Sequence, residues 1–125
     1  MASRRLLAVP VIVAALALGA CGSQGIELAE DDPNYEGARL FDANCAGCHT
    51  LSVAGADGSA TDIGSRERRD GPNFNERAES VEDVLYAIRN GGFSSGPMPQ
   101  NILTGEEAQK VAEFVAKYSG GGGGG

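Results

Sequence analysis

The chain contains one histidine, three cysteines and two methionines among 125 residues, so few side chains are available to bind a metal. The histidine is His49, and Cys21 is the only cysteine outside the segment 45–48. A structural zinc site at this segment would need a second pair of Cys or His ligands, and the chain has no such pair. A thioredoxin-like dithiol would lie near a strand–helix–strand pattern, which the sequence does not show.

Basic side chains are also scarce, because 10 Lys and Arg stand against 17 Asp and Glu. Two of the ten, Arg4 and Arg5, lie in the first twenty residues, which contain no acidic residue. Without that segment the chain has eight basic and 17 acidic side chains and a formal charge of −9. Such a surface makes nucleic acid an unfavourable partner. The remaining length is enough for one domain.

The chain also lacks an apolar run of membrane-spanning length. The run 6–18 is interrupted by Pro10 and is too short for an ordinary spanning helix. Together with the two preceding arginines, it predicts an export signal over residues 1–20. The run ends in Leu-Gly-Ala-Cys at 18–21, which resembles the bacterial lipoprotein box and favours a lipid on Cys21. The alternative is an ordinary signal cleaved after Ala20 that leaves Cys21 as a free thiol.

With two or more acyl chains, Cys21 would hold the protein stably on the outer face of the bacterial cytoplasmic membrane, on its periplasmic or extracellular side. Residues 21–32 are polar, acidic and without helical periodicity, which predicts a tether. Its residues 22–32 reach about 36 Å when fully extended, enough for the domain to swing between neighbouring membrane complexes. We expect the domain itself over residues 33–119 and a disordered glycine tail over 120–125.

The segment Cys45-Ala-Gly-Cys48-His49 places two thiols and one imidazole within a single helical turn. Cys-x-x-Cys-His is the attachment signature of a c-type haem. Each thiol forms a thioether with a haem vinyl group, and the imidazole becomes the proximal iron ligand. The pattern therefore predicts one covalent haem c, held by Cys45, Cys48 and His49.

A first helix is predicted to begin at Asp32 as N-cap, with Pro33 in the first helical position, and to lead into the haem motif. Gly37, Leu40 and Phe41 recur at helical spacing. Glycine costs stability in a helix. Either Gly37 packs closely against another helix, or it is merely tolerated.

Two further helices follow from caps and periodicity. Ser80 with Asp83 predicts a capping box and Gly91 a C-terminal stop, so the segment 80–90 is a helix. Thr104 as N-cap with Glu107 at the third helical position predicts a second capping box and a last helix that ends at 118. The apolar positions of both segments match the i, i+3, i+4, i+7 pattern. We expect part of the first of these helices to line the haem and the second to cross the helix before the haem motif near Gly37 and Phe41.

The segment 50–70 is rich in Gly, Ser and Asp and predicts a loop. Its arginines, Arg66, Arg68 and Arg69, either meet a haem propionate or an acidic partner, or are simply solvated. The turn 71–74 follows. An axial histidine usually donates its second ring N–H to an acceptor such as a backbone carbonyl, and we expect the carbonyl of Pro72 to serve.

The sixth iron ligand decides what a haem protein does. A second histidine is absent, and Met98 is the only methionine after the signal segment. Pro97 and Pro99 fix φ on both sides of Met98 and favour an extended conformation. We therefore expect Met98 to bind the iron through its thioether; the alternative is an apolar side chain that fills a surface loop.

From about Pro33 to Ser119 the chain resembles a class I cytochrome c in its Cys-x-x-Cys-His motif, its 71–74 turn, its methionine loop and its paired first and last helices. The resemblance implies an all-α fold of three to four helices around one haem. It also implies thioether anchors at Cys45 and Cys48, His49 as proximal ligand, the Pro72 carbonyl as acceptor and Met98 as distal ligand. Phe74 departs from the family, which more often has leucine there, and the acidic surface departs from the basic haem edge of the mitochondrial members.

These observations predict an electron carrier rather than an enzyme. It would pass single electrons from a quinol-oxidising complex or a dehydrogenase to a terminal oxidase or a similar acceptor, in a respiratory or photosynthetic membrane. A histidine–methionine pair leaves no open coordination site and favours a relatively high reduction potential. The alternative is a haem-based gas sensor or a peroxidase-like enzyme with an open sixth site. The lack of a distal histidine removes acid–base help for O–O cleavage.

Overall fold

The computed structural model describes residues 25–121, and residues 1–24 and 122–125, including Cys21, the export signal and most of the glycine tail, lie outside them. Its elements are α1 (Tyr35–Asn44), β1 (Thr50–Leu51), η1 (Ser52–Ala54), β2 (Ala56–Asp57), η2 (Ile63–Ser65), α2 (Val81–Asn90), α3 (Gly105–Tyr118) and η3 (Ser119–Gly121). Three α-helices dominate, as the sequence predicts. None of the described helices is long and apolar enough to span a bilayer.

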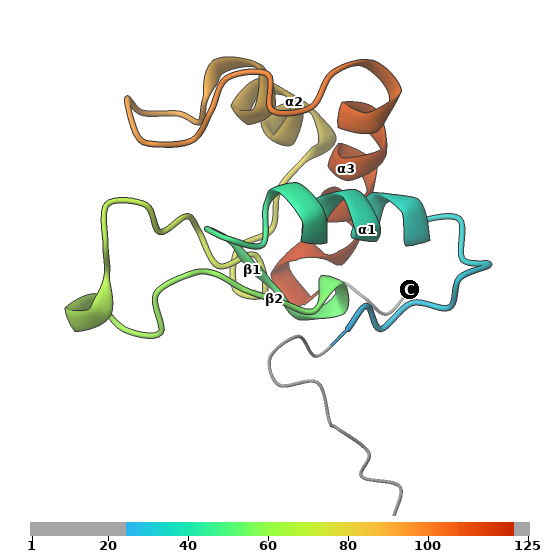
Figure 1. Cartoon of the computed structure of the whole chain (residues 1–125), viewed down its shortest axis with the longest axis horizontal. Coiled ribbons are helices and arrows are strands. Elements are labelled where there is room, and N and C mark those ends of the chain that lie inside the picture. The colour runs from blue at the N-terminus through green and yellow to red at the C-terminus, as the bar shows by residue number, and fades with distance from the viewer. Residues whose placement is uncertain (1–24, 122–125) are drawn as a thin grey trace, which may run out of the picture.

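Helix α3 packs about as extensively against α2 as against α1, and helices α1 and α3 cross (Figure 1). They meet at Gly37, where an added Cβ would lie 2.6 Å from the carbonyl oxygen of Lys110 and 2.7 Å from Cβ of Phe114. One turn later Phe41 packs against Phe114, with ring centroids 6.0 Å apart. The expected crossing near Gly37 and Phe41 is confirmed, and close helix packing explains why this helix contains glycine.

The start of α1 differs from the prediction. The helix begins at Tyr35 and its N-cap is Asn34, not Asp32. The carboxylate of Asp32 accepts hydrogen bonds from the backbone N–H of Asn34 at 2.7 Å and from its Nδ2 at 2.9 Å. Asp32 therefore closes a turn ahead of the helix, which is the competing use of a short polar side chain next to a proline.

The caps of α2 follow the prediction more closely than those of α3. The hydroxyl of Ser80 accepts from the N–H of Asp83 at 3.1 Å, and Gly91 ends the helix in the left-handed region at φ 76°. Thr104 is the N-cap of α3 as expected, but its side chain makes no capping hydrogen bond. Its predicted capping box with Glu107 is therefore wrong, and the helix relies on packing of its buried face.

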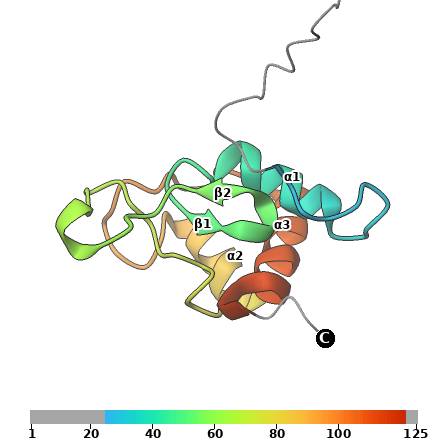
Figure 2. The same cartoon turned by 90° about the horizontal axis from the view of Figure 1, so that it is seen from below.

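The segment 50–70 is not a plain loop. Strands β1 and β2 pair antiparallel, with Thr50 opposite Asp57, and η1 connects them (Figure 2). Gly55 provides the turn with φ 68°. Two-residue strands carry too little alternation to be detected in a sequence rich in Gly and Ser.

Residues 25–32 pack on the domain rather than extending from it. The N–H of Glu27 donates to the carbonyl of Val53 at 2.9 Å, and the side chains of Ile26 and Leu28 rest against the hydrophobic core. The opposite end shows a similar difference, because the N–H of Gly120 donates to the carbonyl of Phe74 at 2.7 Å. Part of the expected tether and the first residue of the expected tail are thus bound to the domain.

Candidate functional site

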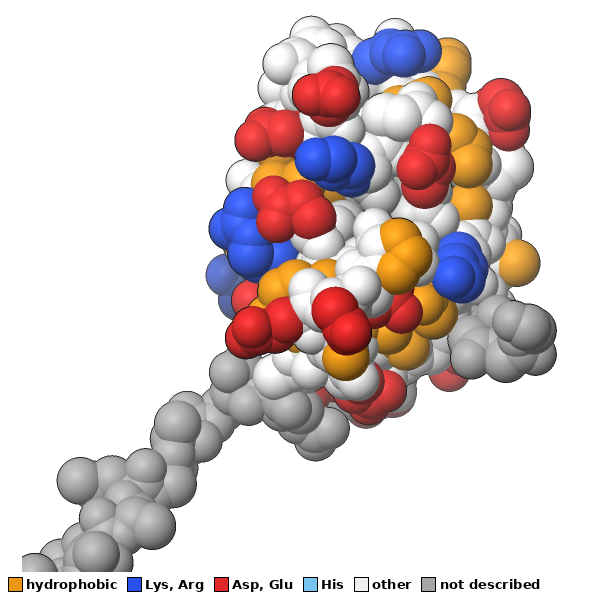
Figure 3. Space-filling view, turned by 90° about the vertical axis from the view of Figure 1, so that its right-hand side faces the viewer, with side chains coloured by type: hydrophobic (Ala, Val, Ile, Leu, Met, Phe, Trp, Pro, Cys, Tyr) orange, Lys and Arg blue, Asp and Glu red, His pale blue; other side chains and the backbone are white. Residues whose placement is uncertain are grey.

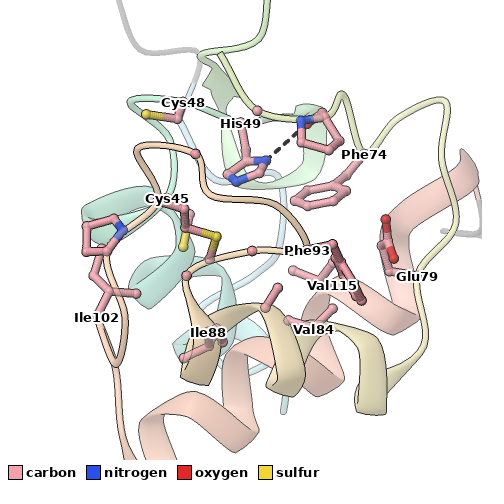
Figure 4. Close-up of a pocket in the computed structure, with 18 of the residues that line it drawn as sticks. Cys45, Cys48, His49, Phe74, Glu79, Val84, Ile88, Phe93, Ile102 and Val115 are labelled. Atoms are coloured by element: carbon pink, nitrogen blue, oxygen red, sulfur yellow. Dashed lines mark hydrogen bonds between the residues drawn. The ribbon is translucent and has the colours of Figure 1, made fainter. Parts of the chain in front are cut away.

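The segment 45–49 forms a tight turn directly after α1. The N–H of Cys45 donates to the carbonyl of Phe41 at 2.7 Å, and the N–H groups of Cys48 and His49 both donate to the carbonyl of Cys45, at 3.1 and 3.0 Å. The turn brings both cysteines and the imidazole to the wall of one cavity of about 350 Å³ (Figure 4). The three residues predicted to hold the haem therefore share one site.

Gly58, just after β2, holds this turn from outside. Its N–H donates to the carbonyl of His49 at 3.1 Å. A Cβ at Gly58 would overlap the carbonyl oxygen of Ala46 and lie 2.6 Å from the backbone nitrogen of Cys48. Only glycine permits this approach of two backbones, so Gly58 belongs to the site although the sequence pattern did not single it out.

The imidazole of His49 is oriented by the 71–74 turn. Its Nδ1 lies 3.1 Å from the carbonyl oxygen of Pro72, the acceptor that the sequence indicated. With hydrogen on Nδ1 the ring donates to this carbonyl and leaves Nε2 free to bind iron. Burial lowers the pKa of His49, against the opposing effect of the hydrogen bond to Pro72, and the charge of Arg77 lowers it further. The environment thus favours the neutral imidazole, which is the form that binds metals.

Two other residues of the same turn touch the imidazole, and sequence reasoning missed both contacts. A Cβ at Gly71 would overlap Cε1 of His49 and lie 2.5 Å from its Nδ1, so only glycine fits against the ring. The ring of Phe74 stacks on the imidazole with centroids 4.6 Å apart and planes 11° apart. The Gly-Pro-x-Phe pattern indicated a turn, but only the fold shows that the whole turn serves the histidine.

The interior of the cavity is mostly apolar. Its wall includes side chains from all three helices, namely Phe41, Val84, Ile88, Val111 and Val115. Val84 and Ile88 come from the helix face that was expected to line the haem. Burial raises the pKa of the Cys45 thiol to about 12, and the neighbouring Cys48 adds to this effect.

Several charged side chains line the cavity. Arg66 and Arg69 line it, whereas Arg68 does not. Glu79 and Arg77 also line it and form an ion pair with Oε1 and Nε 2.5 Å apart, in which the Glu79 side chain is only 7% exposed. Two of the three arginines noted in the sequence therefore reach the site, in positions suited to an anionic substituent of a cofactor.

Met98 reaches the same cavity from the segment between α2 and α3. Its side chain is half-buried and packs against the core. Gly91 and Gly92 begin this segment with φ values of 76° and 86°, and a Cβ at Gly92 would lie 3.8 Å from Sδ of Met98. Left-handed backbone at two successive glycines lets the chain turn back so that the methionine borders the cavity.

The residues present fit a haem c. The cavity combines two thiols one helical turn apart, an imidazole with its second nitrogen occupied, a thioether and a largely apolar wall. Thiols and imidazole are the groups that hold and ligate this cofactor. Within residues 25–121, no group of three or more His, Cys, Asp or Glu side chains is arranged to hold a bare metal ion, so a zinc site has no ligand set there.

Comparison with known proteins agrees with this chemistry. Residues 35–119 match the Cytochrome c family. The chain is 32% identical over 85 residues to the chloroplastic cytochrome c6 of Chlamydomonas reinhardtii, in an alignment that covers 66% of this chain and 53% of that protein. The chain thus spans about half the length of this curated relative.

Among solved structures, the chain is similar to the c-type cytochrome SorU from Sinorhizobium meliloti. The two share 38% sequence identity with a TM-score of 0.55, and the match covers 73% of this chain and 95% of that one. The family match, the three-helix fold and the Cys-x-x-Cys-His motif are in agreement, and covalent haem c is the cofactor that the family binds through this motif. This chain therefore belongs to the cytochrome c family.

Proposed function

We propose that this protein carries single electrons between redox partners at the outer face of a bacterial cytoplasmic membrane, where a lipid on Cys21 anchors it. The observation that carries this proposal is the placement of His49 and Met98 at the wall of one cavity beside both cysteines. A haem ligated by both side chains has no open position for a substrate and supplies a reversible one-electron couple. Similarity to cytochrome c6 and to a c-type cytochrome supports the same function.

The protein contributes a rigid ligand set. Pro97 and Pro99 restrict the backbone on both sides of Met98, and the hydrogen bond to Pro72 restricts His49. Ligands that move little keep the reorganisation energy low when the iron changes its oxidation state. A thioether ligand also favours the reduced form and so a relatively high potential.

Carbon monoxide tests the assignment of Met98. We expect the visible spectrum of the dithionite-reduced holoprotein to stay unchanged when carbon monoxide is added, because Met98 occupies the sixth position. Met98→Ala should give a marked Soret shift under the same conditions, which shows that the probe reaches the iron. A shift in the unchanged protein at modest carbon monoxide would contradict the carrier proposal and favour a sensor or a peroxidase-like enzyme.

The partners follow from the charge of the surface. Acidic side chains outnumber basic ones in the sequence, and Figure 3 shows acidic side chains with basic ones among them on the face that forms the right-hand side of Figure 1. A partner with a basic docking face would be attracted at long range, and added salt would slow the association. The donor would be a quinol-oxidising complex or a dehydrogenase, and the acceptor a terminal oxidase or a similar complex.

The closest contact with a partner would fall on the uncharged part of the surface that borders the cavity. Residues 90–105, which include Met98, contain no charged side chain. Phe93 lines the cavity, is 62% exposed and stacks on Tyr86, with ring centroids 5.0 Å apart. An exposed aromatic pair beside the haem site supplies the apolar contact that a transient redox complex needs at its centre.

The anchor would hold the domain close to the bilayer. Because the chain packs on the domain from Gly25 onward, Cys21 is separated from the packed part by four Cα–Cα steps, at most about 15 Å. The first described residues lie beside the hairpin of β1 and β2. This is the end of the molecule opposite α2 and the methionine segment, residues 91–104 (Figure 1). The hairpin end would then face the membrane. Cys21→Ser should release the holoprotein from membranes with its visible spectrum unchanged.

A further inference from the structure

The proximal histidine has an unusual neighbour in Phe74. The two rings are nearly parallel, at 11°, and their centroids are 4.6 Å apart. On the helix side Phe41 meets Phe74 edge to face, with centroids 6.1 Å apart and planes at 65°. Phe41 is buried in the core and also faces the imidazole, with centroids 6.5 Å apart, so the three rings pack against one another. Figure 4 shows Phe74 beside His49.

The backbone of Phe74 is fixed on both sides. Its N–H donates to the carbonyl of Thr50 at 2.8 Å, and its carbonyl accepts from the N–H of Gly120 at 2.7 Å. Thr50 directly follows His49 and forms a parallel bridge with Asn73. The residue that stacks on the imidazole is thus hydrogen-bonded to strand β1, which begins directly after the histidine, and to η3, which follows α3.

The contact with Gly120 depends on glycine. Gly120 has φ 67°, and a Cβ there would lie 2.7 Å from Cβ of Ala78. The neighbouring Ser119 is buried, and its hydroxyl accepts from the N–H of Glu79 at 2.9 Å. The first glycine of the C-terminal run therefore closes the segment 74–79 against the end of α3.

We propose that Phe74 is a positioning residue that sets the rotation of the axial imidazole, and that Gly120 holds Phe74 in place. The hydrogen bond to Pro72 fixes one atom of the ring, whereas a parallel ring fixes its plane. A leucine at this position would have no ring plane to stack on the imidazole. The orientation of this imidazole, and with it the spectra of a haem bound there, then depends on the ring of Phe74. This role rests on the proposed ligation of the iron by Met98, which the carbon monoxide experiment tests separately, and not on the lipid or the partners.

The test replaces the ring while keeping an apolar side chain. In the full-length holoprotein, Phe74→Leu should change the electron paramagnetic resonance g-values of the low-spin ferric haem and the spread of its paramagnetically shifted haem methyl signals. We also expect at least a threefold change in the ratio of reduced to oxidised protein at a fixed applied potential. By the one-electron constant of 59 mV per tenfold, this is a shift of about 28 mV. Phe74→Tyr retains the ring and should give the same g-values and haem methyl signals as the unchanged protein.

A matched variant separates positioning from general packing. Phe114 is also aromatic but fully buried, and it packs against Phe41 and Tyr118, with centroids 6.0 and 5.3 Å away. Phe114→Leu should lower stability but leave the g-values and methyl signals unchanged. The proposal is overturned if Phe74→Leu leaves these signals unchanged, or if Phe114→Leu moves them as much.

The role of Gly120 has its own readout. Gly120→Ala should shift the same methyl signals in the same direction as Phe74→Leu, by a smaller amount, because it displaces the backbone of Phe74 without removing its ring. Gly121→Ala serves as the control, since no atom lies within 4 Å of a Cβ there and its positive φ imposes a comparable backbone strain. Equal effects of the two variants would overturn the part of the proposal that concerns Gly120.

Discussion

Gly37 of α1 lies directly against Lys110 of α3. A Cβ on Gly37 would be 2.6 Å from the carbonyl oxygen of Lys110. The opposing atom belongs to the helix backbone and cannot rotate away, unlike the end of a side chain. The close crossing of the two helices, on which the position of the haem motif at the end of α1 depends, is therefore set by a single missing methyl group.

Gly37→Ala should lower the free energy of unfolding of the holoprotein. Alanine is favoured over glycine in a helix by about 1 kcal/mol. Overpacking a tight contact costs about 1–3 kcal/mol. We expect a net loss of up to about 2 kcal/mol in denaturant unfolding followed at the Soret band. Gly47→Ala, where a Cβ would meet nothing within 4 Å, should leave stability nearly unchanged. A stabilised Gly37→Ala protein would contradict the close crossing.

Gly71→Ala should disturb the iron ligand more than the fold. The added methyl group would overlap the imidazole of His49, so the ring must rotate or move away from the carbonyl of Pro72. We expect a changed Soret maximum and a changed reduction potential, with α-helical circular dichroism retained. Gly96→Ala, in the methionine segment, meets only Oγ of Ser94 at 3.8 Å and should leave both quantities as they are. An unchanged spectrum in Gly71→Ala would refute the contact.

The stability contribution of Asp32 should depend on pH. Hydrogen bonds from the backbone and then the side chain of Asn34 lower the pKa of Asp32 below its ordinary value of 3.8. The folded state then binds fewer protons than the unfolded state as the pH falls below that value, and the stabilisation present above it is lost. The difference in Tm between the unchanged protein and Asp32→Ala should shrink below about pH 4.

A control removes the neighbouring charge. The carboxylate of Asp31 accepts no hydrogen bond from residues 25–121, so Asp31→Ala should show no comparable dependence on pH. If Asp32→Ala lowers Tm by the same amount at pH 3 and pH 7, the ionised carboxylate is not what stabilises the turn before α1.

Patterns within one element allowed much of this fold to be predicted. The helix periods, the stop at Gly91 and the Cys-x-x-Cys-His motif depend on spacings that the sequence displays directly. The role of Gly37 in close packing depends on which helix lies opposite it. The apolar stripe of the last helix made that helix the expected neighbour. The start of α1 was misplaced because Asp before Pro serves equally well as a cap or as the acceptor of a preceding turn.

The contacts that sequence reasoning missed all join distant segments through backbone or ring surfaces. Gly58 and Gly71 look like ordinary loop glycines, and only the fold shows that each faces the haem motif. Phe74 was noticed as a departure from leucine, but a stack on His49 has no spacing signature because 25 positions separate the two residues. The lipid, the export signal and the domain limits remain predictions.

The packed N-terminal segment offers a prediction that separates a tether from a bound strap. Glu27→Pro removes the N–H that donates to the carbonyl of Val53. Residues 25–28 should then detach, and the heteronuclear NOE of Leu28 should fall while the visible spectrum stays unchanged. Glu30→Pro is the control, because it removes the same charge. Residue 30 is the second position of a turn that the N–H of Asp32 closes on the carbonyl of Ala29, and proline is tolerated there. This variant should leave Leu28 ordered. If Leu28 is as mobile in the unchanged protein as in Glu27→Pro, residues 25–28 are not bound to the domain. The longer tether over residues 21–32, with its greater reach from the membrane, would then be the correct description.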